Sequence, residues 1–225
     1  MHPLDNVIWH ALTTRQAEFA EGTGPSRRFA KEVSPLTAFD EENHAAYESL
    51  GKLVGSGGVA GLFLDHPYEA RQDWKYLAGA PLSQMVCSAS NGRPTTDAAI
   101  VELGTKDSPE MLELTSLTKP GPFGTRTHEL GTYLGIRQNG KLAAMAGERL
   151  KVPGYTEVSA VCTHPDHTGK GYARLLMLEI MHRIRVRGET PFLHVRQDNT
   201  RAIELYKWLG FSERKLGHYA VLRRN

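Results

Sequence analysis

The sequence is poor in cysteine and in long apolar runs. Its only cysteines, Cys87 and Cys162, stand far apart inside apolar stretches, which fits buried thiols in a reducing compartment better than a disulfide framework. No apolar run approaches the ~18 residues that a membrane-spanning helix needs, so no membrane association is expected. The first twenty residues include Asp5, Arg15 and Glu18 and so lack the apolar core of a secretory signal. These absences predict a cytoplasmic protein.

Two classes of ligand are also disfavoured by what is missing. Cys162, His164 and His167 are close in sequence, but neither a CxxC pair nor an HExxH helix is present, and their spacing matches no zinc site. A metal site is therefore not expected. The net charge is only +2 and there are three tryptophans, with no stripe of basic and aromatic residues, so nucleic-acid binding is not expected either.

What the sequence does contain is typical of a globular protein, with 40% hydrophobic and 23% charged residues. Segments rich in glycine, proline and small polar residues interrupt it at 56–58, 88–97 and 118–124. Because the charge balance changes at the second of these, we expect a domain boundary near residue 96. It would separate an N-terminal mixed α/β region (1–96) of unknown role from a second domain (97–225). The second part is rich in basic residues, which fits an anionic ligand.

The second part alternates between strand-like and helix-like patterns. Asn139-Gly140 is a strong two-residue hairpin turn between two apolar strands, and the helix-spaced apolar residues of 173–188 end at a glycine. Strands are expected at 98–104, 131–138, 141–150, 156–164, 191–197 and 218–223, and helices at 108–118, 125–131, 173–188 and 199–210. This order predicts an α/β fold of the α+β type, a mixed central β-sheet flanked by helices.

The segment HPDHTGKGYA, residues 164–173, carries two glycines two positions apart. It follows an apolar strand and precedes a helix, so its backbone N–H groups and the helix dipole can converge on one anionic group. Gly169 and Gly171 would let a pyrophosphate approach the backbone, and Lys170 would add a charged contact. The alternative is that the glycines only shape a turn. Neither GxxxxGK[ST] nor GxGxxG is present, which disfavours ATP and NAD.

A second segment, N-x-x-A-x-x-L-Y-x-x-x-G-F at 199–211, follows the glycine loop after one helix and one strand. Together the two segments resemble the GNAT superfamily of acetyl-CoA-dependent N-acyltransferases. The coenzyme loop of that family reads Gln/Arg-x-x-Gly-x-Gly/Ala, with Gly171 and Ala173 at the two small positions here. Thr168 stands where the family has glutamine or arginine. The resemblance covers 97–225 and is nearest to the glycine N-acyltransferase-like group.

The resemblance implies where acetyl-CoA binds. The strand at 156–163 would splay from the next one and leave its backbone free for the pantetheine arm, with the Val161 N–H donating to the thioester carbonyl. Cys162 would pack in the core, because direct transfer needs no acyl-enzyme. The residues expected to contact the coenzyme are Val161, Cys162, Thr163, Thr168, Gly169, Lys170, Gly171, Tyr172, Ala173, Asn199 and Tyr206.

Acetyl transfer to an amine also needs a base and an acid. The resemblance puts the base at Glu157, on the strand that opens the site, with Glu148 or a water relay as alternatives. Either glutamate would otherwise be solvated or paired with an arginine. Tyr206 would protonate the leaving thiolate, while also serving as a core aromatic. His164 and His167 flank the loop, where they relay protons, contact phosphate or only decorate the turn.

The resemblance therefore implies an N-acetyltransferase that uses acetyl-CoA and no metal and acts by direct attack in a ternary complex. The acceptor would be an amino acid or another small amine, with a peptide N-terminus or a lysine as the alternative, and the N-terminal part would close over the acceptor side or form a homodimer. Two other readings are a non-catalytic acyl-CoA sensor and a nucleotide-binding module. The first would not need both Asn199 and Tyr206, and the second lacks its phosphate-binding motifs.

Overall fold

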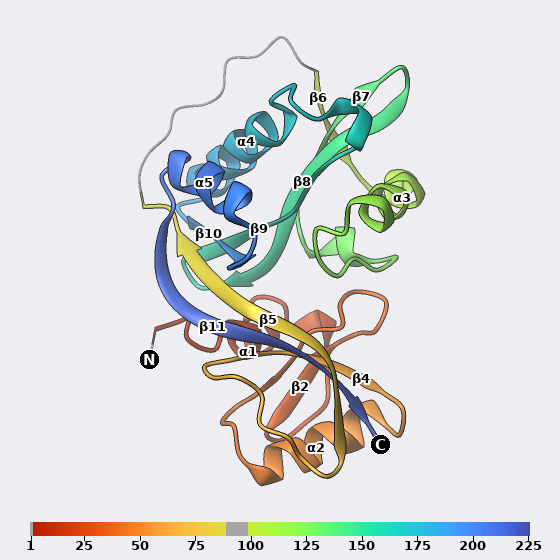
Figure 1. Ribbon diagram of the computed structural model, residues 1–225, viewed down its shortest axis with the longest axis vertical. Helices are drawn as coiled ribbons and strands as arrows, with labels where there is room; N and C mark the ends of the chain where they lie inside the picture. The colour runs from red at the N-terminus through yellow and green to blue at the C-terminus, as the bar shows by residue number, and fades with distance from the viewer. Residues whose placement is uncertain (1, 89–98) are drawn as a thin grey trace.

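The computed structural model describes residues 2–88 and 99–225, which form two β-sheets and their covering helices (Figure 1). The smaller sheet has the order β1-β2-β3, and the larger one has the order β4-β11-β5-β10-β9-β8-β7-β6. The helices are α1 (Val7–Thr13), α2 (His44–Val54), α3 (Ser108–Thr118), α4 (Tyr172–Val186) and α5 (Thr200–Trp208). The strands are β1 (Ala20–Glu21), β2 (Ser26–Phe29), β3 (Thr37–Phe39), β4 (Val59–Leu64), β5 (Trp74–Val86), β6 (Ile100–Leu103), β7 (Tyr133–Gln138), β8 (Lys141–Val152), β9 (Tyr155–Thr163), β10 (Thr190–Arg196) and β11 (Ser212–Arg224).

The predicted mixed sheet flanked by helices is confirmed. Only β9 and β10 run parallel, and every other neighbouring pair in the large sheet is antiparallel. The apolar faces of α4 and α5 pack on one side of the sheet in one core with Ile136, Ala146 and Val158. On the other side lie α1, which packs with Leu150 and Val152, and α3. The site described below therefore lies in a sheet that is covered on both faces.

The chain before residue 88 completes the large sheet. Strand β5 lies between β11 and β10, and it pairs with β11 from Trp74 to Val86 as a long curved ribbon (Figure 1). Strand β4 adds the outer edge beside β11. The boundary expected near residue 96 falls outside the described residues, and the eight-stranded sheet draws strands from both sides of it.

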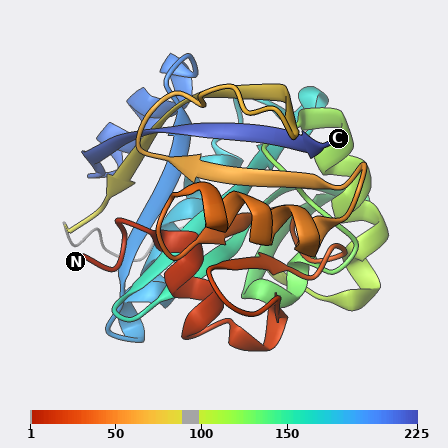
Figure 2. The same ribbon diagram turned by 90° about the horizontal axis from the view of Figure 1, so that it is seen from below.

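The remaining N-terminal elements close one end of the molecule. Helix α2 packs with Leu62 of β4 and Leu222 of β11, and the N-terminal segments lie together against the sheet (Figure 2). Gln16, which is buried, donates to the Arg149 carbonyl and accepts from the Lys151 N–H. This side chain joins the N-terminal segment to β8 at Arg149, which lines the pocket described below.

Candidate active site

Strands β9 and β10 lie side by side for only three residue pairs before they separate. Their parallel ladder runs from Tyr155/Thr190 to Glu157/Phe192, after which β9 continues against β8 and β10 against β5. Both strands line a pocket of about 510 Å³ beyond this point, which we call the central pocket. Residues 158–163 of β9 and 193–196 of β10 form its walls there. Because the two strands separate here, backbone groups that would be hydrogen-bonded between strands in a regular sheet face the pocket instead.

A β-bulge shapes the β9 side of the pocket. Cys162 lies opposite Met145 and Ser159 opposite Gly147, so Ala160 and Val161 share the place of one residue. Ala160 has φ = 52°, a left-handed conformation that costs a non-glycine residue roughly 1–2 kcal/mol. Bulges redirect the backbone of the strand that carries them. The strained residue, Ala160, directly precedes Val161, for which the family resemblance predicts a backbone hydrogen bond to the thioester.

The glycine loop adopts the conformation that its sequence predicts. Gly169 and Gly171 have φ = 80° and 76°, a region in which other residues are disfavoured. Apart from the adjacent residues, no atom of the described chain lies within 4 Å of where a Cβ would stand on either glycine, so the space above both is open. Gly171 is the N-cap of the 15-residue α4, and as a glycine it has no side chain to cap that helix. Its first backbone N–H groups and its dipole are free to receive an anion.

The polar side chains of the loop mostly bond within it. The Thr168 hydroxyl donates to the Pro165 carbonyl at 3.0 Å, and the Lys170 ammonium lies 3.2 Å from His167 Nδ1. His164 Nδ1 accepts from the Asp166 N–H. The threonine thus stabilises the turn where the family has a longer glutamine or arginine. Tyr172 and Ala173 begin α4, which the loop leads into.

Asn199 and Tyr206 both line the central pocket. The Asn199 side chain accepts from the Ala202 N–H and so caps α5. The ring of Tyr206 packs against Phe211, and burial raises the pKa of its hydroxyl to about 12. This hydroxyl therefore stays protonated at neutral pH. The structural roles considered for both residues are present, and neither prevents a contact with the coenzyme.

Glu157 stands where β9 and β10 separate, but it is fully buried. Arg149 donates two hydrogen bonds of 2.8 Å to its carboxylate, and His194 Nδ1 lies 2.6 Å from Oε1. Burial alone would raise the pKa of Glu157, but the charge and hydrogen bonds of Arg149, together with His194, lower it to about 2. So weak a base does not itself take a proton from an amine at neutral pH. It holds Arg149 and His194 in place.

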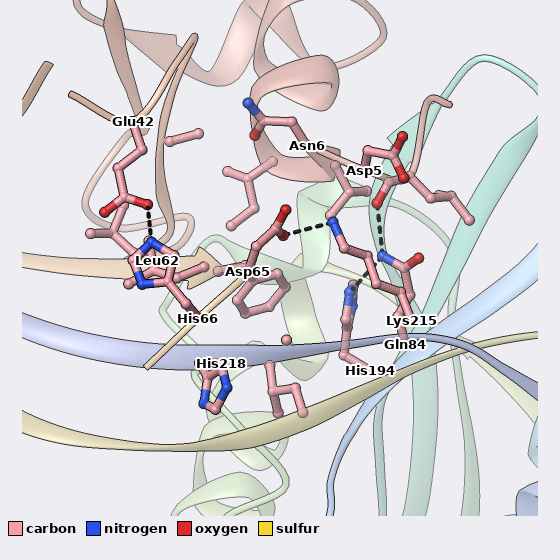
Figure 3. Close-up of a pocket in the computed structure, with 18 of the residues that line it drawn as sticks. Asp5, Asn6, Glu42, Leu62, Asp65, His66, Gln84, His194, Lys215 and His218 are labelled. Atoms are coloured by element: carbon pink, nitrogen blue, oxygen red, sulfur yellow. Dashed lines mark hydrogen bonds and ion pairs between the residues drawn. The ribbon is translucent and has the colours of Figure 1, made fainter. Parts of the chain in front are cut away.

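His194 is the residue that the sequence reasoning missed. It lies on β10 between the rings of Phe63 and Phe192, and it lines the central pocket as well as a second one of about 340 Å³ (Figure 3). A signal was present in PFLHV, residues 191–195, where one titratable residue stands in an otherwise apolar run shortly before the second family motif. Its meaning required the contact with Glu157, which lies 37 residues earlier.

The structure gives structural roles to the other two residues considered for catalysis, Glu148 and Cys162. Glu148 has no exposed surface, forms ion pairs with Arg187 and Lys151, and lines neither pocket. Cys162 is buried against the α3 core, and burial raises the pKa of its thiol to about 11. A thiol that stays protonated is a poor nucleophile, in agreement with the packing role expected for it.

The charges around the central pocket suit an anionic coenzyme. Its side chains include three cations, Lys119, Arg149 and Arg196, of which Arg149 is paired with Glu157 and Arg196 with Asp198, and no carboxylate is among the lining residues that the structure describes. The glycine loop adds helix N–H groups and Lys170. In the described chain no three of His, Cys, Asp and Glu gather in a way that would hold a metal ion, and no helix there is long and apolar enough to cross a membrane.

Comparison with known proteins agrees with this geometry. The FR47-like protein family model matches residues 133–220. The ribosomal protein bS18 alanine N-acetyltransferase of Escherichia coli K12 is 31% identical over 132 residues, which are 56% of this chain and 84% of that protein. A crystal structure of a putative GNAT-family acetyltransferase from Novosphingobium aromaticivorans is 35% identical with a TM-score of 0.91, and the match covers 100% of both chains. A GCN5-related N-acetyltransferase from Kribbella flavida shares the fold at 16% identity and a TM-score of 0.62, over 96% of this chain and 92% of that one.

The fold and the split-strand site are those of an acyl-CoA-dependent transferase. The chain belongs to the GNAT superfamily of N-acetyltransferases, and it is an acyltransferase enzyme. The match to the Novosphingobium protein extends through the N-terminal region, which the sequence resemblance did not include.

Proposed function

We propose that this enzyme moves an acetyl group from acetyl-CoA to a primary amine by direct attack in a ternary complex. The observation that carries the proposal is the pocket between the diverging β9 and β10, which joins backbone donors, Tyr206 and His194 in one space of about 510 Å³. Because the pocket reaches both strands, a thioester and an amine can meet there without a covalent enzyme intermediate.

The glycine loop and β9 would hold the coenzyme. The open left-handed glycines at 169 and 171 and the uncapped start of α4 fit a pyrophosphate, with Lys170 beside it. Thr168, Tyr172 and Ala173 complete the loop. The backbone of Val161, Cys162 and Thr163 would receive the pantetheine arm, with Asn199 on the facing helix. Bound acetyl-CoA supplies an activated thioester.

Two groups would stabilise charge as the acetyl group leaves sulfur. The Val161 N–H would donate to the carbonyl oxygen, a type of contact worth roughly 3 kcal/mol in other acyl transferases. The Tyr206 hydroxyl would give its proton to the departing thiolate. Its raised pKa keeps the hydroxyl protonated until that moment, so the donor is present in every turnover at neutral pH.

His194 would take the proton from the amine, directly or through one water, with Glu157 behind it. From the sequence, Glu157 itself is expected to be the base. Because Glu157 is held in a buried ion pair with Arg149, it would instead assist His194. As the amine nitrogen bonds to the carbonyl carbon and the C–S bond breaks, the amine proton would pass to the imidazole of His194. Glu157, 2.6 Å from Nδ1, stabilises the imidazolium that forms.

The acceptor is proposed to be a small amine such as an amino acid. Leu36 and Phe63 of the N-terminal region, with Pro120 and Pro122 of the loop after α3, wall the pocket and limit the size of what enters. A peptide N-terminus is the second candidate, because one relative is named for acetylating the alanine of a ribosomal protein. The glycine N-acyltransferase-like grouping, a homodimer and a cytoplasmic location stay predictions from the sequence.

Thiol release from acetyl-CoA, measured with matched small amines and short peptides, tests this function. We expect turnover with amino acids or other small amines and a lower kcat/KM for peptides that begin with alanine. A higher kcat/KM for peptides would select the second candidate. Binding of acetyl-CoA by calorimetry without release of thiol to any amine would contradict catalysis and favour the sensor. Thermal stabilisation by ATP without any by CoA would contradict the coenzyme site.

A further inference from the structure

The guanidinium of Arg149 is only partly used by its ion pair with Glu157. An arginine side chain has five N–H groups, and the Glu157 carboxylate accepts one from Nε and one from Nη2. The third nitrogen, Nη1, donates to no residue of the described chain, and it is not fully enclosed by protein. Because Arg149 lines the central pocket, the two N–H groups of Nη1 are open to that pocket.

Tyr219 of β11 brings a hydroxyl to the same part of the pocket. Its ring meets the ring of Phe63 edge-on with 5.8 Å between centroids, and Cζ of Arg149 lies 5.9 Å from the centroid of Phe63, so the two polar groups flank one aromatic side chain. A Cβ on Gly61 would stand only 3.1 Å from the hydroxyl, so the glycine leaves room for it. This hydroxyl bonds to no residue that the structure describes. Burial raises its pKa, so it stays protonated and can donate.

The Tyr219 side of the pocket lies across the sheet from the groups proposed to hold the coenzyme. Phe63 and Tyr219 pack against the core that contains α1, whereas Tyr206 packs against the core that contains α4. These two cores lie on opposite faces of the large sheet, and the central pocket is lined from both through the opening between β9 and β10. Coenzyme bound at the α4 and α5 side therefore leaves Arg149 and Tyr219 for the other substrate.

The chemistry of these donors fits a carboxylate. Its two oxygens accept several hydrogen bonds, and the paired N–H groups of a guanidinium match their spacing. The charge balance also favours an anion, because Arg149 is already neutralised by Glu157 and Arg196 by Asp198. Lys119, the remaining cation of the pocket, has no ion pair in the part of the chain that the structure describes. A ligand with one negative charge would balance it.

We propose that Arg149 Nη1 and the Tyr219 hydroxyl bind a carboxylate of the acceptor, which makes the acceptor a short amino acid. The proposal rests on the acetyl transfer proposed above and names its substrate class. His194 Nδ1 and Arg149 Nη2 lie 2.6 and 2.8 Å from the same oxygen of Glu157, so the imidazole and the guanidinium are held close together. An acceptor with its carboxylate on Arg149 and its amine beside His194 therefore has only a short carbon chain between the two. A peptide places its carboxylate too far from its N-terminal amine to use both.

The test compares amino acids with their amides, which keep the amine and lose the carboxylate. Glycine and alanine are measured beside glycinamide, alaninamide and the long-chain ε-aminocaproate, and kcat/KM should fall as the chain lengthens. Tyr219→Phe should raise KM for the best amino acid by about 10-fold or more, the effect of one hydrogen bond to a charged group, and leave kcat and the KM of the matching amide nearly unchanged. Because the two amines differ in pKa, their ratio is compared between variants at one pH. Tyr76→Phe is the control, since Tyr76 is exposed and lines neither pocket.

Arg149→Lys is the second variant, because it keeps a cation beside Glu157 but loses the planar fork. It should lower kcat/KM for the amino acid more than for the amide, whereas a purely structural defect lowers both alike. Calorimetry with CoA present measures amino-acid affinity without turnover, and Tyr219→Phe should weaken it by about 10-fold or more. Equal changes for amino acid and amide in both variants, or loss of the preference in Lys119→Met alone, overturn the proposal. Binding that depends on Tyr219 without any acetyl transfer contradicts the proposed function and supports the carboxylate site.

Discussion

Glu157 Oε1 lies 2.6 Å from His194 Nδ1 at the point where the parallel ladder of β9 and β10 ends. The strand geometry that opens the pocket therefore also joins a carboxylate to an imidazole across the opening.

The first prediction concerns the imidazole of His194. His194→Gln should lower kcat by about 10²–10⁴ at neutral pH, the usual range for loss of a general base, with little change in acetyl-CoA affinity. Steady-state kinetics and calorimetry measure the two effects. His218→Gln, in the second pocket, is the control and should keep its turnover.

Tyr206→Phe should lower turnover more than it lowers acetyl-CoA affinity. Phenylalanine preserves the packing against Phe211 and removes only the proton that the thiolate would receive. The loss of kcat should be about 10²-fold or more, the lower end of what one proton-transfer group contributes. Thiol-release kinetics beside direct binding separate the two quantities, and an unchanged kcat would remove Tyr206 from the acid role.

Gly171→Asp should abolish coenzyme binding. The new side chain enters the open space above the loop, its charge opposes a pyrophosphate, and φ = 76° is unfavourable for aspartate. Gly140→Asp is a matched control, since Gly140 has φ = 80° and nothing near a Cβ but lies in the hairpin turn after β7. Calorimetry with CoA should show binding to the control alone, and normal binding to Gly171→Asp would contradict the phosphate site.

Arg149→Met should destabilise the fold by about 3–5 kcal/mol, because it leaves the buried carboxylate of Glu157 without its partner. Urea unfolding at pH 7 measures this free energy. Arg196→Met breaks an ion pair with Asp198 that is exposed on both sides and should change stability little. Similar losses of unfolding free energy in the two variants would show that burial does not make the Glu157–Arg149 ion pair more important for stability than an exposed one.

The ion pair between Glu157 and Arg149 also makes the free energy of unfolding depend on pH. The pKa of Glu157 is lowered in the folded protein to about 2 from 4.5, so its contribution to stability is complete above the unfolded value and is lost as the pH falls through the folded one. The free energy of unfolding should therefore decrease between pH 4.5 and 2. Arg149→Met should flatten that part of the curve. Urea midpoints measured over this range are the check, and parallel curves would contradict the assignment.

The second part of the chain was largely predictable, because its signals are local. The Asn139-Gly140 hairpin, the glycine loop with its helix and the motif at 199–211 each depend on neighbours in sequence, and β7, β8, α4 and α5 lie where they were expected. Glu157 was recognised as important for its position, but its partners were not. The bidentate contact with Arg149 and the contact with His194 depend on how β8, β9 and β10 align, and no periodic pattern encodes that.

The N-terminal half could not be placed from sequence. The sequence alone identifies residues 1–96 only as a mixed α/β region, and in the structure β5 of this region spans Trp74–Val86. Its pairing with β11 links residues more than one hundred positions apart. Neither propensity nor charge indicates such a partner, so no local pattern predicted that Gln84 of β5 lies 3.2 Å from His194.

The position of β5 also constrains the order of events during synthesis. The ribosome completes β5 before either of its neighbours in the sheet, β10 and β11, has been made. Until those strands emerge, both edges of β5 lack their final partners, and unpaired strand edges are sites of wrong association. The large sheet is complete only when β11, the last strand of the described chain, has paired with β4 and β5 from the first half. Neither half of the chain can therefore form the active site alone.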